Sequence, residues 1–154
     1  MYVNKIELKN IRGFADLKFN LARPDGSYAG WTVFTGDNGS GKSSLLKAIA
    51  VALTGKDTAR ALQPSFHRWI REGAVGHEGR IDLTIAPEKG VDAFSGVGNT
   101  AYKNFPATII LKNVGKETIA EVLDSQKTAR RGLWSNDAHG WFSCGYGPFR
   151  RVFG

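Results

Sequence analysis

The chain has 154 residues, of which 42% are hydrophobic, so it is long enough to bury a core and ordinary in composition for one folded domain. Its formal net charge of +7 favours polyanionic partners, namely nucleotides, nucleic acids or acidic protein surfaces. The sequence contains neither an apolar run of the roughly 18 residues that a membrane helix needs nor a signal peptide, so we expect a cytoplasmic protein without a membrane partner. Cys144 is the single cysteine, which excludes an internal disulfide, and we expect it to be a small buried apolar residue.

Two strands are predicted at the start of the chain. Residues 3–9 place Ile6 and Leu8 on one side and charged residues on the other, which is the period of two of a half-buried strand. Residues 16–21 repeat this alternation. The intervening NIRGFA is too short for a crossover helix and contains Gly13, so we expect the two strands to form an antiparallel pair.

A glycine-rich stretch follows the apolar run WTVFT at residues 31–35, which reads as a central strand buried on both faces. Residues 36–44, GDNGSGKSS, fit the phosphate-binding pattern GxxxxGKS at every position. Its glycines let the backbone curl with its N–H groups pointing inward, Lys42 supplies a mobile cation, and Ser43 offers a hydroxyl to a magnesium ion. The alternative is a surface turn rich in Gly and Ser that matches the pattern by chance.

The residues after the glycines favour the phosphate-binding interpretation. KSSLLKAIAVALTG carries apolar residues at helical spacing and ends at Gly55, where a helix stop belongs. Strand, glycine loop and helix are therefore expected to be contiguous. In that arrangement the helix amino terminus directs unpaired N–H groups and the positive end of its dipole at the bound phosphates.

The rest of the chain gives weaker signals. Three histidines, at 67, 77 and 139, have no neighbouring metal-ligand candidates and are expected at the surface or in packing roles. Residues 57–73 predict one interrupted helix or two short helices, broken near Pro64 and with Phe66, Trp69 and Ile70 as the later apolar face. Strands are expected over 80–85 and 107–114, and a strand rather than a helix over 117–123, after a hairpin turn at Gly115-Lys116. A long loop is expected over 88–105 and a polar basic loop over 126–140.

Three phrases of the sequence together resemble the amino-terminal part of an ABC-type ATPase head. They are KNIRGF, WTVFTGDNGSGKSSLLKAIAVAL and the late GYGPFRR, whose Tyr146, Pro148 and Arg150 match an aromatic-x-Pro-x-Arg phrase of the family. The resemblance is to the branch of AAA family ATPases that includes SMC proteins, RecF, double-strand-break-repair ATPases and the OLD-like and PtuA-like ATPases of bacterial anti-phage systems. It is dense at both ends of the chain and thin from about residue 57 to residue 140.

The resemblance implies a fold and a set of site residues. The fold is α/β, a P-loop NTPase lobe with a mixed sheet and an antiparallel opening hairpin. Arg12 matches an arginine that such heads hold near the nucleotide, and the alternative is an ordinary exposed hairpin arginine. Phe14 is expected in the hairpin core rather than beside the base. Gln126 is a candidate for the magnesium-sensing glutamine, although a surface loop residue is the preferred interpretation. The implied ATP-binding residues are Gly36, Asp37, Asn38, Gly39, Ser40, Gly41, Lys42, Ser43, Ser44 and Arg12, and Ser43 is the implied magnesium ligand.

Two parts of a complete head are not found in the sequence. A Walker B strand ending in Asp-Glu and a signature loop are missing, and the nearest candidate, Glu121 to Asp124, has too short an apolar run. We therefore expect residues 1–154 to be one partial head lobe that cannot hydrolyse ATP alone, because it lacks an acid to hold magnesium and orient water.

The expected partners follow from the same resemblance. They are ATP, a second copy or the missing carboxy-terminal half, and nucleic acid or an effector nuclease. Two other functions stay open: a small P-loop kinase or GTPase complete in itself, and a truncated or split module that binds nucleotide or a partner without turnover.

Overall fold

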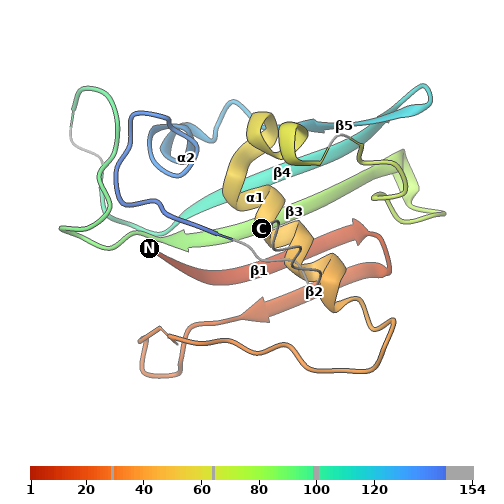
Figure 1. Cartoon of the computed structure of the whole chain (residues 1–154), viewed down its shortest axis with the longest axis horizontal. Helices are drawn as coiled ribbons and strands as arrows, with labels where there is room; N and C mark the ends of the chain where they lie inside the picture. The colour runs from red at the N-terminus through yellow and green to blue at the C-terminus, as the bar shows by residue number, and fades with distance from the viewer. Residues whose placement is uncertain (29, 64, 99–100, 145–154) are drawn as a thin grey trace, which may run out of the picture.

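The computed structural model describes residues 1–28, 30–63, 65–98 and 101–144 of the chain, and its centre is a five-stranded sheet in the order β2-β1-β3-β4-β5 (Figure 1). Every strand pair is antiparallel. The strands are β1 (Tyr2–Ile11), β2 (Phe14–Asn20), β3 (Glu78–Ala86), β4 (Phe105–Val114) and β5 (Glu117–Glu121), and the helices are α1 (Lys42–Leu62), α2 (Lys127–Arg131) and the 3-10 turn η1 (Val75–His77). In the described part of the chain, no helix is long and apolar enough to cross a membrane.

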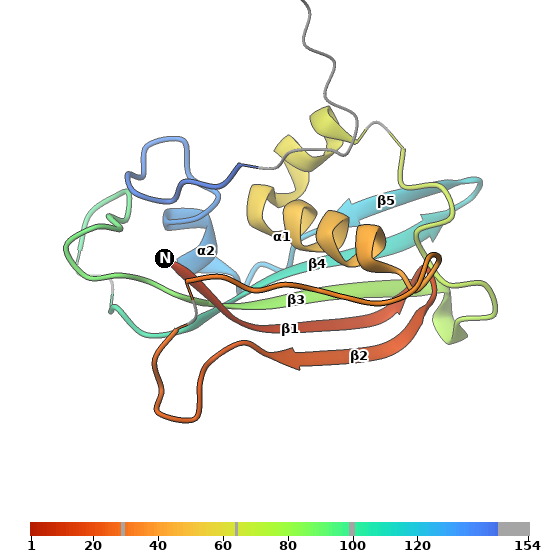
Figure 2. The same ribbon diagram turned by 60° about the horizontal axis from the view of Figure 1, so that its bottom comes forward.

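The alternation in the sequence sets the two faces of this sheet. Ile6, Leu8, Ile81 and Leu83 are each at most 1% exposed, because they point to the side that α1 covers (Figure 2). The opening antiparallel pair is confirmed, as are the predicted strands over 80–85 and 107–114 and the hairpin that leads into β5. The expected mixed sheet is wrong for the described residues, since none of their strands runs parallel to a neighbour.

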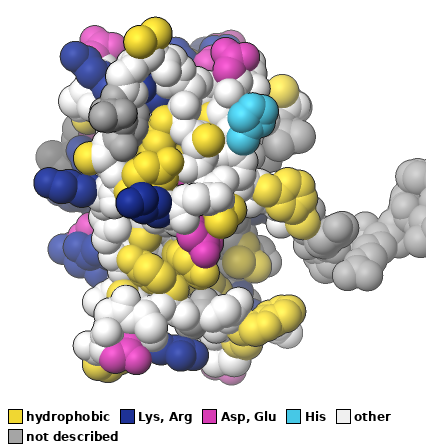
Figure 3. Space-filling view, turned by 90° about the vertical axis from the view of Figure 1, so that its left-hand side faces the viewer, with side chains coloured by type: hydrophobic (Ala, Val, Ile, Leu, Met, Phe, Trp, Pro, Cys, Tyr) yellow, Lys and Arg dark blue, Asp and Glu magenta, His cyan; other side chains and the backbone are white. Residues whose placement is uncertain are grey.

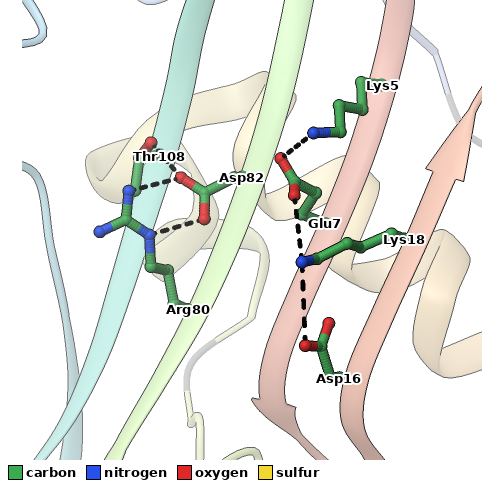
Figure 4. Close-up of polar contacts among 7 residues, drawn as sticks. All are labelled: Lys5, Glu7, Asp16, Lys18, Arg80, Asp82 and Thr108. Carbon is green, nitrogen blue, oxygen red and sulfur yellow. Dashed lines mark hydrogen bonds and ion pairs between the residues drawn. The ribbon is translucent and has the colours of Figure 1, made fainter.

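The opposite face of the sheet carries charged side chains that neutralise one another (Figure 4). Arg80 donates hydrogen bonds to both oxygens of Asp82, at 2.6 and 2.8 Å, and this pairing raises the pKa of the guanidinium above its usual value. Lys5 and Lys18 both pair with Glu7, at 2.9 and 4.0 Å. On this solvated face, Arg80, Lys5 and Lys18 therefore already have carboxylate partners.

Helix α1 lies across the other face, and the glycine expected to end it instead marks a break inside it. Gly55 has φ 75° and ψ 169°, so the helix runs to Gly55, breaks, and resumes to Leu62. The Trp134 side chain fills the space beside Gly55, and its Nε1 donates to the carbonyl of Ala52 at 2.9 Å. A left-handed glycine thus lets a tryptophan from the carboxy-terminal segment pack against the helix backbone.

Replacing Gly55 by alanine is expected to destabilise the fold by about 2–4 kcal/mol, from left-handed strain plus overpacking. A Cβ at this position would lie 2.9 Å from Trp134 ring atoms. Gly115→Ala is the matched control, because Gly115 has φ 61° but no atom near its missing Cβ, so it carries the strain alone. Urea unfolding of both variants measures the difference, and equal losses would show that the Trp134 contact contributes nothing.

The segment after α1 differs from the prediction. Phe66 and Trp69 are buried as expected, at 3% and 1% exposure, but residues 65–73 form no helix. Ile70 instead bridges to Ile11 at the end of β1. A backbone hydrogen bond joins this segment to β1, since the Arg71 N–H donates to the Asn10 carbonyl at 2.9 Å. The sequence before it contains a proline, a residue type that has no N–H with which to continue a helix.

The long loop reaches the amino-terminal end of β1, where the Met1 amino group pairs with Asp92 at 2.9 Å. Hydrophobic side chains gather on this side of the molecule (Figure 3). Phe94 and Phe105 each pack edge-on against Trp141, and their ring centroids lie 4.9 and 5.8 Å from that of Trp141.

The predicted loop over 88–105 is confirmed up to Asn104, apart from residues 99–100, which the structure does not describe. The predicted loop over 126–140 is wrong in part, because it contains α2. Cys144 is exposed rather than buried. The predicted motif residues Tyr146, Pro148 and Arg150 lie outside the described residues.

Candidate functional site

The glycine-rich loop connects an extended segment to the first turn of α1. Gly39 and Gly41 have φ angles of 84° and 94°, which side chains larger than glycine rarely adopt. The Ser40 N–H donates to the Asp37 carbonyl at 3.2 Å, and the Leu45 N–H donates to the Gly41 carbonyl at 2.9 Å as the first helical bond. The loop therefore closes tightly and passes directly into a helix.

Lys42 folds back over this loop. Its Nζ donates to the carbonyl oxygens of Gly36 and Asp37 at 2.6 and 2.7 Å, and it lies 3.4 Å from the Ser40 hydroxyl. These contacts hold the ammonium at the loop, and no carboxylate of the described residues pairs with it. An unneutralised cation held at a glycine-rich loop before a helix is suited to bind an anion.

The first turn of α1 adds to this anion preference. Gly41 is the residue before the helix, no side chain caps the helix amino terminus, and the first turn contains no acidic residue. The first N–H groups of a helix have no intrahelical acceptor, and the positive end of the dipole lies there. Ser43 is exposed and Ser44 half-buried in this turn, so the Ser43 hydroxyl can reach a bound ligand.

The segment before the loop contradicts the prediction of a buried central strand. Residues 31–35 form no ladder with any described strand, and the Trp31 and Val33 side chains are 91% and 78% exposed. Phe34 alone turns inward and packs against Phe19, with 5.6 Å between ring centroids. A central strand needs a hydrogen-bonded neighbour on each side, and the described residues supply neither.

Arg12 lies beside the loop in the turn between β1 and β2. Its guanidinium carbon is 5.0 Å from the centroid of the Trp69 ring, and its Nε is buried without a hydrogen-bond partner. Arg12 and Ser44 line the same open cleft of about 850 Å³. Arg12 is half-buried and stacked rather than an ordinary exposed hairpin arginine, and the structure brings it to the same cleft as the carboxy-terminal end of the loop.

Other cationic residues line this cleft, and the sequence did not place them there. Arg68, Arg71 and Lys116 come from the segment after α1 and from the β4–β5 turn. Within the described parts of the chain, none of the three forms an ion pair. Residues 67–72, HRWIRE, are rich in basic residues, but their position beside Ser44 depends on the contact between Ile70 and Ile11.

Gln126 does not lie in this cleft. It is 5% exposed rather than on the surface, and its Oε1 accepts a hydrogen bond from the Thr108 N–H at 2.9 Å. The side chain thus satisfies the backbone of β4. His67 and His77 line the cleft and are exposed, and His139 is exposed at the other end of the sheet. In the described ranges, no group of three or more His, Cys, Asp or Glu residues could hold a metal ion.

Asp124, at the end of the nearest Walker B candidate, is an exposed residue that lies 3.6 Å from Arg130. It lies beyond the edge strand β5 and does not line the cleft beside the loop. The nearest Walker B candidate therefore offers no acid at the glycine loop, and the predicted magnesium ligand Ser43 is an exposed hydroxyl in the first turn of α1.

Comparison with known proteins gives consistent results. A family model described as "AAA domain" matches residues 5–136. The DNA replication and repair protein RecF of Mesorhizobium japonicum is 32% identical over 96 residues, which are 62% of this chain and 23% of RecF. The Septu protein PtuA of Bacillus mycoides is 38% identical over 86 residues, which are 55% of this chain and 12% of PtuA. The matched part of the chain thus spans less than a quarter of either relative.

A solved structure shares the fold. It comes from work titled "Structural biochemistry of ATP-driven dimerization and DNA stimulated activation of SMC ATPases", and the match has a TM-score of 0.51 and 17% identity. The match covers 89% of this chain and 82% of that one. The arrangement of sheet, glycine loop and helix therefore confirms the resemblance to an ATPase head of the SMC type and the expected P-loop lobe.

Proposed function

Because this chain belongs to the AAA domain family, we propose that it is the ATP-binding lobe of an ATPase similar to RecF, PtuA and SMC heads. The observation that carries the proposal is the glycine loop at the start of α1, where Lys42 donates to two loop carbonyls and pairs with no carboxylate among the residues that the structure describes. The residues proposed to contact ATP are Gly36, Asp37, Asn38, Gly39, Ser40, Gly41, Lys42, Ser43, Ser44 and Arg12.

The nucleotide would lie with its phosphates in the loop and its nucleoside toward the cleft. Backbone N–H groups and Lys42 neutralise charge on the phosphate oxygens, and Ser43 supplies the protein oxygen for Mg²⁺. Magnesium, when bound, would act as a Lewis acid toward the phosphate group. The cleft that begins at Ser44 and includes Arg12 offers the room and the positive charge for the rest of the nucleotide.

We propose that turnover needs a second component. Glu72 is the one described acidic residue that lines the cleft, and it does not end a Walker B strand, so we assign the acid that orients water to the remainder of the protein. The complete ATPase would bring two heads together around ATP. It would couple hydrolysis to nucleic-acid processing or to control of an anti-phage effector, for which the relatives RecF and PtuA are the respective support.

Equilibrium titration of the chain with a fluorescent ATP analogue, with and without Mg²⁺, tests the proposal. Saturable binding that unlabelled ATP displaces is expected. An affinity for ATP no greater than for inorganic sulfate would contradict it, because the loop would then be a general anion site. Phosphoryl transfer to a small acceptor by the chain alone would favour a complete kinase instead.

Arg12→Ala is expected to weaken ATP binding by about 10-fold to 150-fold, since a charge-assisted hydrogen bond contributes about 1.5–3 kcal/mol. Arg23→Ala is the control, because Arg23 is an exposed arginine outside the cleft and its loss changes the net charge equally. Arg12→Lys, which keeps the charge, is expected to bind with intermediate affinity. Equal affinities for all these variants would show that Arg12 only stacks on Trp69.

A further inference from the structure

The ring of Phe14 lies directly against the last glycine of the P-loop. A Cβ built on Gly41 would lie 2.5 Å from Phe14 Cζ and 3.1 and 3.3 Å from the two Cε atoms, so the tip of the ring faces this residue. Phe14 is half-buried and also packs against the core, as predicted from the sequence. One side chain of the opening hairpin therefore contacts both the core and the loop.

The turn that carries Phe14 is held from several sides. Phe14 pairs with Ile11 at the end of the β1–β2 hairpin. The Arg12 N–H donates to the Trp69 carbonyl at 2.7 Å, and Arg71 donates from its N–H to the Asn10 carbonyl at 2.9 Å. The Arg71 guanidinium also donates to the Gly13 carbonyl at 2.6 Å. These bonds fix the position of the ring relative to β1 and to Arg12.

The loop itself has weaker connections to the sheet. The hydrogen bonds that involve its described residues come from within the loop or from α1. The preceding residues 31–35 have no ladder bonds, and their contact with the hairpin is through Phe34 and Phe19. Phe14 is thus the side chain that joins the carboxy-terminal end of the loop to the braced turn.

We infer that Phe14 is a positioning residue, which sets the P-loop at a fixed distance from Arg12 so that both sides of the nucleotide site are formed before ATP binds. The inference rests on the proposed function in that the loop and Arg12 bind one nucleotide. The ring acts through the backbone of Gly41 and needs no contact with ATP. Its effect is preorganisation, because an ordered loop does not lose entropy when the ligand binds.

Two substitutions change the ring tip while leaving the rest of the hairpin similar. Phe14→Leu removes the tip, and Phe14→Tyr adds an oxygen on Cζ, toward Gly41. Both are expected to weaken binding of the fluorescent ATP analogue about tenfold, because a loop that is no longer preorganised must be ordered when the ligand binds. Leu17→Ala is the control, because Leu17 lies on the same strand and packs against the core. It is expected to lower the melting temperature but leave affinity within about twofold.

Hydrogen exchange of the amides at residues 36–45 separates this inference from the proposed function, since it needs no ligand. Faster exchange there in both Phe14 variants, but not in Leu17→Ala, supports the positioning role even if the chain binds no ATP. Unchanged exchange in both Phe14 variants, or an equal increase in Leu17→Ala, would overturn it. Absence of ATP binding by the wild-type chain would contradict the proposed function instead.

Discussion

Lys42→Ala is expected to abolish measurable ATP binding, with an affinity loss of about 100-fold to 10,000-fold. The ammonium is the cation nearest the centre of the loop, and it stands 2.6 and 2.7 Å from the carbonyl oxygens of Gly36 and Asp37. Its removal takes away the charge that neutralises the outer phosphates and leaves those carbonyls facing the anion. Two charge-assisted bonds of about 1.5–3 kcal/mol each give an effect of this order. Titration with the fluorescent ATP analogue measures it.

Lys47→Ala provides the matched control for this substitution. Lys47 is an exposed lysine on the same helix, and it does not contact the glycine loop. Its replacement changes the net charge by the same amount, so a purely electrostatic field effect would weaken both variants similarly. Wild-type affinity in Lys42→Ala would sink the proposal that the loop binds phosphate, provided that the melting temperatures of the two variants agree.

The parts of the fold that depend on local patterns were predictable. In β1 and β3 one face is buried and the other charged, so the period of two in their sequences identified them correctly. The first helix followed from apolar spacing in the same way. Helix α2, by contrast, has five residues, and a helix this short has too few turns for periodicity to emerge.

Residues 31–35 show why an apolar run alone was misleading. The run predicts a strand buried on both faces, but a strand is buried in a sheet only where neighbouring strands pair with it. No described strand pairs with residues 31–35. Trp31 and Val33 face solvent as a result. The apolar run thus indicates side chains that are suited to burial, but it does not show that this lobe buries them.

The candidate site divides in the same way. The P-loop residues are consecutive in sequence, and their motif was sufficient to identify them. The association of Arg12 with Ser44 rests on a resemblance to known heads, and the shared cleft agrees with it. The contact of Phe14 with Gly41 and the position of Lys116 depend on tertiary packing between segments distant in sequence, for which the residues themselves give no signal.

A carboxy-terminal head segment is expected to bind along residues 31–35 and to turn a nucleotide-binding lobe into an ATPase. This segment forms no ladder with the strands that the structure describes, and it exposes the side chains of Trp31 and Val33, which an added strand would cover. The curated relatives extend far beyond the matched part, so each has residues available for such a strand. The general base on the added part would raise hydrolysis by about 100-fold to 10,000-fold over the lobe alone.

Coexpression of the lobe with the carboxy-terminal part of a homologous head, followed by phosphate-release assays, measures this effect. Trp31→Glu is expected to prevent both association and stimulation while leaving ATP binding by the isolated lobe unchanged, because a carboxylate would have to be buried without a partner. Phe142→Glu is the control, since Phe142 is 81% exposed on a different segment. If Trp31→Glu associates normally, residues 31–35 are not the docking edge. Full hydrolysis by the lobe alone would mean that the chain already contains its own catalytic acid.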